Sequence, residues 1–379
     1  MLADPPANTV VGDTRVFTVE DGANVTITCT PNAGFKFVEG AVNPIVLSNI
    51  TTDTVVSKFP ESKAVPNTLS LGEFDTTTRT FAGAEGGGSV SGAGTYSLGD
   101  KVVLTAVPDD GYEFAYWTGD VPAAQILDNP LDMTVAGNAS LTAHFVSGRA
   151  VAWKGGTSSL ASDDGNWSDD TRPESGDAVI LSPACAGDIV WDLPDVEPGS
   201  WTQLEGYEGT VTFATTFADS AEDFPVFRVS GDVVLEDGVW THLENPVPTE
   251  CGQAAYRFKA DIGGNLTVGA KARIDANAKG LPGGSGYGYI ELGQNAKQGG
   301  SYGGRGRNST MPCYGSVKNP VDVGAGGTPG NRSTTRGGGC IIISVAGVAH
   351  VNGVLSANGG MSTVTNDSAK NNATSGGTV

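Results

Sequence analysis

Apolar and polar side chains alternate along residues 264–280, which read GNLTVGAKARIDANAKG. The apolar side chains recur at every second position: Leu266, Val268, Ala270, Ala272, Ile274 and Ala276. A period of two is that of a β-strand with one buried face. Residues 347–360 (GVAHVNGVLSANGG) repeat the pattern, so that IDAN at 274–277 corresponds to LSAN at 355–358. Residues 231–242 (GDVVLEDGVWTH) form a weaker relative.

Three short alternating segments, each interrupted by glycine or a small turn, predict successive rungs of a β-solenoid, because each rung buries its inner face only against its neighbours. Glycine or proline recurs every few residues, which argues against helices. We therefore expect a mainly β chain whose C-terminal part is a β-solenoid, namely a right-handed parallel β-helix with Gly-rich loops.

Two earlier stretches, residues 9–59 and 80–146, read as copies of one unit. The interval from Pro31 to Pro108 is the same as that from Gly34 to Gly111. The Asn-Pro pairs at 43–44 and 129–130 are separated by a longer interval. By this difference the second copy gains about nine residues around positions 117–125.

The second copy carries an ordered set of short motifs: GGGSV at 86–90, GYEF at 111–114, WTGD at 117–120, NP at 129–130 and AHF at 143–145. In this order they resemble the divergent InlB B-repeat family, a small β-rich module found in tandem on bacterial surface proteins. The first copy lacks the GGGxV strand and the Trp-x-Gly-Asp turn, so it is expected to be a degenerate copy. The resemblance implies a spacer or adhesive stalk module and brings no catalytic residues.

A third region begins near residue 148, with WKGG at 153–156, NW at 166–167, RP at 172–173 and GDAVI at 176–180. This segment resembles the opening of large bacterial extracellular β-helix proteins. Trp153 and Trp167 are predicted to cover the open end of the first rung, which would otherwise expose unpaired edges. The expected organisation is a partial B-repeat-like module at 1–62, a second module at 63–147 and a solenoid at 148–379. The solenoid comprises a capping segment at 148–205 and a Gly-rich loop layer at 280–339, and both chain ends read as cut from a longer protein.

Residues 280–339 are unusually rich in glycine, as in GSGYGYIELG and GGSYGGRGRNS. Composition alone favours a flexible linker. The interspersed tyrosines, and the glycines at 337–339 that lead directly into an apolar strand, favour an ordered layer in which backbones approach too closely for a side chain. The order of motifs also resembles Gly-rich solenoid segments of large bacterial surface proteins.

The balance of 22 basic against 42 acidic residues gives a net charge of −20, which argues against nucleic acid, because phosphate binding needs clustered Lys and Arg. No Walker-type phosphate loop is present, so no nucleotide is expected. No apolar run reaches membrane-spanning length, so no membrane span is expected. With only 17% charged residues and 55 glycines, the composition is typical of bacterial surface and secreted β-proteins. We expect an extracellular or cell-surface location.

Acidic residues gather near the cap, and their carboxylates are the type of ligand that calcium prefers. The candidate calcium ligands are Asp163, Asp164, Asp169, Asp170 and Asp177. The alternative is a solvated acidic turn, since no EF-hand or calcium β-roll spacing is present. Other than structural calcium, no cofactor is expected.

Tyrosine and arginine in the Gly-rich segment form a candidate glycan-binding platform, because tyrosine rings stack on sugars and arginine adds directional donors. The candidates are Tyr287, Tyr289, Tyr302, Arg305, Arg307 and Tyr314. The alternative is that these tyrosines pack loop on loop. Cys313 and Cys340 are the candidate disulfide that would close this segment, against the alternative of buried or incidental thiols. His144, His242 and His350 are expected at surface-facing strand positions.

These patterns predict a non-enzymatic segment of a large bacterial cell-surface or secreted protein, acting as a stalk, adhesion or scaffolding element. Its expected partners are extracellular polysaccharide, or a glycan or protein of a host or neighbouring cell. The alternative is a carbohydrate-binding or polysaccharide-degrading β-helix protein, a lyase or hydrolase, whose chemistry would need carboxylates on successive rungs. No residue is assigned a catalytic role.

Overall fold

The computed structural model describes the backbone of eight strands within residues 1–71. Beyond them it describes residues 87–96, 99–136, 139–185, 187–214, 225–246, 254–283, 302–303, 313–316, 318–327, 336–360 and 374–379. The chain forms two compact units. The first consists of residues 1–71, 92–105 and 130–141, and the second of residues 72–91, 106–129 and 142–379.

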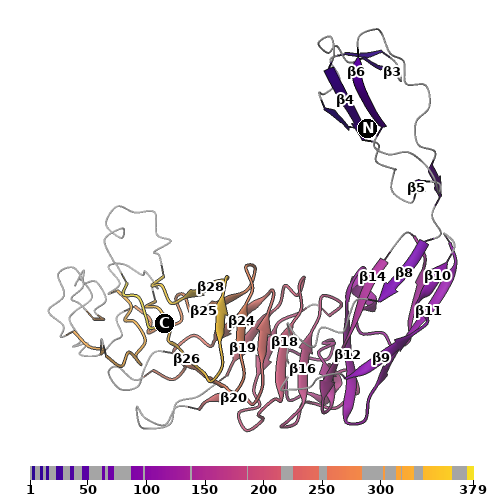
Figure 1. Ribbon diagram of the computed structural model, residues 1–379. Helices are drawn as coiled ribbons and strands as arrows, with labels where there is room; N and C mark the ends of the chain where they lie inside the picture. Colours follow the sequence, from indigo (N-terminus) through magenta and orange to yellow (C-terminus); the bar gives the residue numbers. More distant parts are fainter. Residues whose placement is uncertain are drawn as a thin grey trace. The chain divides into compact units, whose positions relative to one another are not determined.

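The first unit is built from short strands that are mostly antiparallel (Figure 1). One sheet has the order β1-β4-β6, made of β1 (Leu2–Asp4), β4 (Ala23–Thr28) and β6 (Ile45–Ile50). Strands β2 (Thr9–Val11) and β3 (Thr14–Val16) form one hairpin, and β5 (Phe35–Phe37) pairs with β7 (Ser62–Ala64). Strand β8 (Asn67–Leu71) pairs antiparallel with β10 (Gly94–Tyr96) and parallel with the start of β14 (Ala139–Ser147). Strand β11 (Lys101–Pro108) pairs with β13 (Leu131–Thr134).

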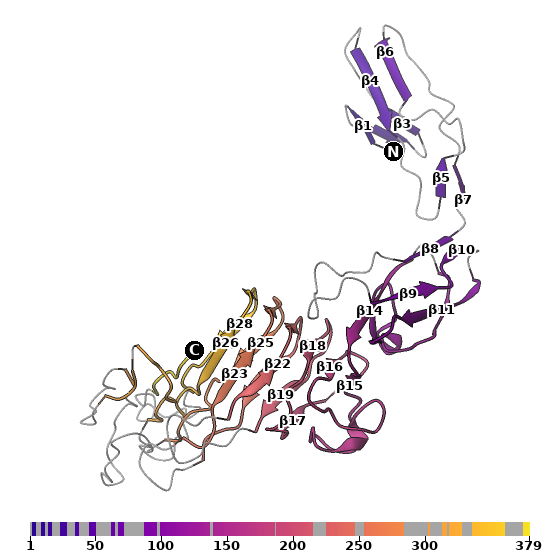
Figure 2. The ribbon, with the colours of Figure 1, turned by 60° about the horizontal axis from the view of Figure 1, so that its bottom comes forward.

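The second unit contains β9 (Gly88–Ser91), β12 (Tyr112–Gly119), the short 3-10 helix η1 (Ala123–Gln125), the end of β14 and a stack of parallel strands. The first solenoid sheet consists of β15 (Ala150–Ala152), β16 (Ala178–Leu181), β18 (Ser200–Gln203), β21 (Val233–Leu235), β24 (Leu266–Val268) and β27 (Ala349–Val351). The second consists of β17 (Ile189–Trp191), β19 (Thr210–Phe213), β22 (Val239–His242), β25 (Arg273–Asp275) and β28 (Val354–Ser356). The third consists of β20 (Phe227–Val229), β23 (Phe258–Ile262) and β26 (Ile341–Val345). Figure 2 shows these strands stacked rung upon rung.

The strand register confirms the repeats read from the sequence. Ile274 pairs with Leu355 and Asp275 with Ser356, as the correspondence of IDAN with LSAN predicts. The weaker relative also forms a rung, since its Val233 pairs with Leu266. The mainly β solenoid prediction is therefore confirmed, while the handedness of the coil stays a prediction.

Rung length shows where the Gly-rich segment belongs. Trp201 pairs with Val233 and Val233 with Leu266, and these two steps along the chain are nearly equal in length. The next step, from Leu266 to its partner Ala349, is more than twice as long. The segment is thus an insertion into one rung, between β25 and β26.

Inward-facing side chains of all three sheets form one apolar core. Six aromatic rings stack at its centre with neighbouring centroids 4.6–6.3 Å apart. They are Trp191, Trp201, Phe213, Phe227, Trp240 and Phe258. Tilted and edge-to-face pairs of this kind add about 0.5–1.5 kcal/mol each beyond their area burial, so the aromatic stack is a principal stabiliser of the middle rungs.

The predicted alternation at 264–280 holds within strands and fails at the corner between them. Leu266, Val268, Ile274 and Ala276 are buried, whereas Ala270 is exposed. Residues 270–271 form the turn between β24 and β25. The chain changes sheet there, so only Ala270 breaks the pattern, and Ala272 is buried again in the same phase.

The surface prediction for the histidines is correct for His350 and wrong for the other two. His350 is exposed, but His144 and His242 are 7% and 0% exposed. His242 can be buried because both of its ring nitrogens have hydrogen-bond partners within the protein. Nδ1 donates to the carbonyl oxygen of Leu243 (2.8 Å), and Nε2 accepts from the amide of Cys340 (3.1 Å).

The described part of the Gly-rich segment is an ordered layer of closely packed backbones. Gly280 N donates to Gly337 O at 2.8 Å, and Gly324 N donates to Gly338 O at 2.7 Å. A Cβ on Gly337 would lie 2.0 Å from the carbonyl oxygen of Gly324. No side chain fits at that separation, which supports the layer prediction over a flexible linker for these residues.

Candidate functional site

Strand β16 is buried on both of its faces. Val179 and Leu181 point into the solenoid core, while Ala178 and Ile180 belong to a separate apolar cluster on the outer face of the first sheet. Ala178 is 2% exposed and Ile180 1%. A solenoid strand needs only one buried face, so something must cover the outside of this rung.

The cover comes from β12 and β14. The outer cluster joins Ala115, Tyr116 and Val146 to four solenoid residues: Ala152, Ala178, Ile180 and Leu204. Tyr116 is 0% exposed and stacks on His144, with ring centroids 4.5 Å apart. We call these seven residues the joint, because they bind the end of the repeat module to the first rungs.

The loop after β12 adds two more apolar side chains. Ile126 and Leu127 pack against the joint. Two bonds made by Trp117 hold the loop: its amide donates to Ile126 O (2.8 Å) and its indole Nε1 to Asp128 O (2.8 Å). This is where the second copy gains residues over the first, so the insertion predicted from the repeat offset contributes to the joint.

The connection between β14 and β15 at the joint is short. Only Gly148 and Arg149 separate β14 from β15. Gly148 has a φ of +88°, a conformation that glycine adopts readily. Beside it, the amide of Ala150 donates to Glu113 Oε2 on β12 at 2.9 Å. This bond between a main-chain amide and a side-chain carboxylate holds the first solenoid strand to β12.

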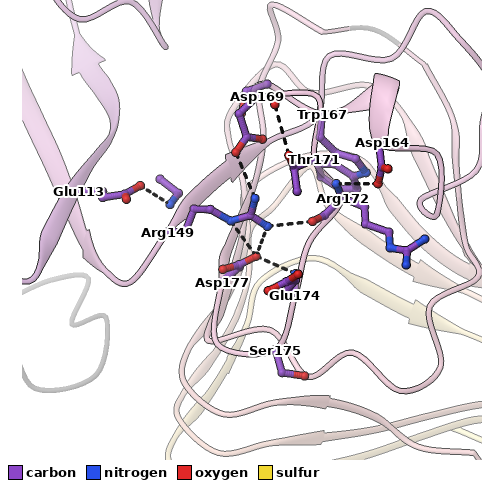
Figure 3. Close-up of polar contacts among 12 residues, drawn as sticks. Glu113, Arg149, Asp164, Trp167, Asp169, Thr171, Arg172, Glu174, Ser175 and Asp177 are labelled. Carbon is purple, nitrogen blue, oxygen red and sulfur yellow. Dashed lines mark hydrogen bonds and ion pairs between the residues drawn. The ribbon is translucent and has the colours of Figure 1, made fainter.

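Arg149, beside the joint, adds a set of charged hydrogen bonds that we call the Arg149 clamp (Figure 3). Its guanidinium donates twice to Asp177 Oδ2, from Nη2 at 2.6 Å and from Nε at 3.2 Å, and once to Asp169 Oδ2 at 3.1 Å. It also donates to the carbonyl oxygen of Arg172 at 2.8 Å. The bonds to Asp177 hold the pKa of Arg149 above its ordinary value. Charge-assisted bonds of this kind are stronger than neutral ones.

The cap lies directly beside this clamp. Trp153 and Trp167 are 1% and 0% exposed and meet edge to face, with centroids 5.1 Å apart. Trp167 Nε1 donates to the carbonyl oxygen of Ala161 at 2.8 Å. Ser162 donates to Asp192 from both its amide (2.9 Å) and its hydroxyl (2.6 Å), which ties the cap to the second sheet. Both tryptophans therefore belong to the solenoid core beside the first rung, and their role as its cap stays a prediction.

The five aspartates predicted to bind calcium do not converge on one point. Asp169 and Asp177 bind Arg149, and Asp170 pairs with Lys154. Asp163 caps the 3-10 helix η2 (Asp164–Asn166), and Asp164 accepts the amide of Arg172 at 3.2 Å. Among the residues that the structure describes, no three acidic, histidine or cysteine side chains are grouped as a metal site would need. Instead the carboxylates hold the cap and the joint together.

Two residues of the predicted glycan platform are described, and they contact each other. Tyr302 and Tyr314 meet edge to face at 5.2 Å. The Tyr314 hydroxyl donates to Val323 O at 2.7 Å, and that of Tyr302 bonds to the Thr378 hydroxyl. Burial raises the pKa of both tyrosines. Their hydroxyls serve internal packing, which is the alternative reading of these tyrosines. Tyr287, Tyr289, Arg305 and Arg307 lie outside the described residues.

The predicted disulfide between Cys313 and Cys340 is not formed, and this corrects the sequence reading. Both are free thiols, with Cys313 exposed and Cys340 buried. Cys340 immediately precedes β26, and its sulfur lies 3.5 Å from Val321 O. Burial raises the pKa of its thiol to about 12, so the thiolate that disulfide exchange requires is strongly disfavoured.

Sequence reasoning missed the joint, although one signal for it was present. Residues 178–181 read AVIL, an uninterrupted apolar run. Such runs are typical of strands buried on both faces, although short apolar runs also occur in other rungs, such as VVL at 233–235. Most of the covering residues lie far from this run along the chain, so no local pattern relates them.

Comparison with known families matches residues 8–61 and 78–149 to the divergent InlB B-repeat domain. The two matched segments coincide with the two copies read from the sequence. The family is typical of bacterial surface proteins. No curated protein and no solved structure matches the chain. Within the described residues, no helix is long and apolar enough to cross a membrane.

Proposed function

We propose that the chain is a non-enzymatic stalk segment of a bacterial cell-surface or secreted protein, in which β12, the end of β14 and the solenoid, all parts of the second unit, carry load as one piece. The joint is the observation that supports this role. A flexible tether would connect its domains by a polar linker rich in glycine and proline. Here the connection is two residues long and flanked by a buried apolar cluster.

Three features add to the strength of the connection. The apolar cluster excludes water. The Glu113 carboxylate accepts the amide of Ala150, and Arg149 binds two aspartates of the capping segment. An extended assembly that bears tension benefits from such connections, because an open hinge would yield before either domain unfolds. Adhesion or scaffolding then belongs to surfaces that the stalk positions, with an extracellular polysaccharide, glycan or protein as partner.

Ile180→Arg tests the proposal. Ile180 points outward, so arginine there leaves the solenoid core intact but places a charge in the joint. In differential scanning calorimetry of the full chain, we expect the parts of the wild type that meet at the joint to unfold together in one cooperative transition. In the variant the module should melt separately and at lower temperature. Thr267→Arg is the matched control, because Thr267 lies on the outer face of the same sheet, away from the joint.

Separate transitions in the wild type, unchanged by Ile180→Arg, would contradict a load-bearing joint.

A second experiment tests the alternative that the chain binds or degrades carbohydrate. The full chain is incubated with a panel of polysaccharides and host glycans, with and without calcium, and the supernatant is assayed for released sugar. Release of oligosaccharide would overturn the non-enzymatic role, and binding without release would support adhesion.

A further inference from the structure

The Gly-rich segment differs in charge from the rest of the chain. Residues 280–339 contain six basic and two acidic residues, which gives the segment a net charge of +4. The remaining residues include 16 basic and 40 acidic ones, which gives them a net charge of −24. A charge asymmetry of this kind points to a partner of opposite sign for the minority part. An anionic partner is therefore attracted to this segment and repelled by the rest of the molecule.

Two cations lie where this segment leaves its rung and returns to it, and both contact one carboxylate. Lys279 directly precedes the segment, and Arg336 lies near the end of it. Arg336 Nε lies 3.2 Å from Glu244 Oε2, and Lys279 Nζ lies 3.9 Å from Glu244 Oε1. We call these three residues the neck. Together they carry a net charge of +1.

The fold holds both cations in place. Arg336 Nη1 donates to the carbonyl oxygens of Asn245 and Gly280. The buried side chain of Asn245 in turn donates to the carbonyl oxygen of Lys279 at 2.8 Å. Ala278, just before Lys279, has a φ of +54°. This left-handed conformation costs a residue other than glycine about 1–3 kcal/mol and persists only where the surrounding structure imposes it. The neck is thus a preformed arrangement of charges.

The neck already accepts one carboxylate, that of Glu244, and has donors for another. Lys279 Nζ lies too far from Glu244 for a hydrogen bond, so their attraction uses none of the three N–H donors of the ammonium group. Among the described residues, the contacts of Arg336 involve its Nε and Nη1. The Lys279 and Arg336 side chains are 27% and 25% exposed, and that of Glu244 is 55% exposed. A ligand from solvent can therefore reach both cations and displace Glu244.

We propose that the neck binds carboxylate groups of a uronate-containing polysaccharide, with Glu244 occupying the site as an internal competitor in the free protein. Guanidinium and ammonium groups are the donors that recognise carboxylates. A polymer with repeated carboxylates also presents several of them to the positively charged segment at once, which raises its avidity. This inference rests on the adhesion role proposed above and names the chemical class of the partner.

Affinity electrophoresis of the full chain in gels that contain polygalacturonate tests the proposal. Methyl-esterified polygalacturonate is the reference polymer, because it has the same backbone without the charge. We expect retardation by the acid and none by the ester. Lys279→Gln and Arg336→Gln should each weaken the binding about tenfold, because each removes a charged donor. Glu244→Gln should instead strengthen it about threefold, because it removes the competing carboxylate.

The opposite signs separate binding from folding. Each of the three substitutions breaks an ion pair of the neck, so a purely structural role predicts weaker retardation for Glu244→Gln as well. Lys271→Gln is the matched control. Lys271 pairs with Glu205 on the turn between β24 and β25, so this substitution removes the same charge without touching the neck. It should bind like the wild type, and circular dichroism establishes that each variant is folded.

A competition arm distinguishes carboxylate recognition from general screening of charge. Oligogalacturonate should relieve the retardation more than sodium sulfate does at the same ionic strength, and equal effects would overturn the assignment to a carboxylate ligand. A wild type that polygalacturonate does not retard would also overturn the proposal, as would neck variants that all bind like the wild type. The calorimetric test of the joint depends on none of these outcomes, so a failure here leaves the load-bearing role standing.

Discussion

At the scale of single residues, Asn245 and His242 are polar side chains that the solenoid buries together with their hydrogen-bond partners. Asn245 is 0% exposed, and its side-chain amide donates to the carbonyl oxygens of Tyr256 and Lys279. His242 is held in the same way between Leu243 and Cys340. A buried polar group without partners costs about 1–3 kcal/mol, so these side chains fix the rung register rather than weaken the core.

His242 predicts how stability depends on pH. Burial lowers its pKa to about 4 from an ordinary value near 6.5. The unfolded chain therefore takes up the proton first as the pH falls, so the contribution of neutral His242 is complete above pH 6.5 and is lost towards pH 4. A shift of this size corresponds to about 3 kcal/mol.

Urea denaturation between pH 4 and 7 measures this effect. The wild type should lose more unfolding free energy on acidification than His242→Gln, in which the titrating group is absent. His350→Gln is the control, since His350 is exposed, and it should follow the wild-type profile. Parallel profiles for the wild type and His242→Gln would contradict the buried, neutral histidine.

At the scale of elements, glycine is required in the inserted layer because neighbouring backbones leave no room for a side chain. Gly337→Ala would place a Cβ 2.0 Å from the carbonyl oxygen of Gly324, and backbone cannot move aside as a side chain can. We expect a loss of about 3 kcal/mol, the upper range for overpacking. Gly376→Ala, in the same layer, meets its nearest atom at 3.6 Å and should change stability by no more than about 0.5 kcal/mol.

Chemical denaturation of the two alanine variants separates close packing from a general intolerance of side chains in this segment. Equal stabilities would mean that the layer is loose. Equal and large losses would mean that factors other than the distance to the neighbouring backbone govern both sites.

The elements also show what the sequence could predict. Periodicity located β24, β25, β27 and β28 and their pairing, because inward-facing residues must repeat at each rung. It failed at Ala270, which lies in the turn between two sheets, and at His242, which is polar but buried. The joint and the Arg149 clamp depend on contacts between distant segments, and charge composition alone suggested calcium where the carboxylates instead bind arginine, lysine and backbone amides.

At the scale of the whole molecule, a solenoid whose stability is the sum of its rungs and their interfaces opens from its weaker end. The rungs of β16, β18 and β21 have neighbours on both sides and inward residues close to 0% exposed, whereas all three residues of β27 are exposed. Native-state hydrogen exchange should therefore show protection that is highest near the joint and falls towards β27 and β28.

The opposite result would be uniform protection from β16 to β28. It would mean that the rungs open as a single cooperative unit, so that the exposure of β27 costs the molecule no local stability.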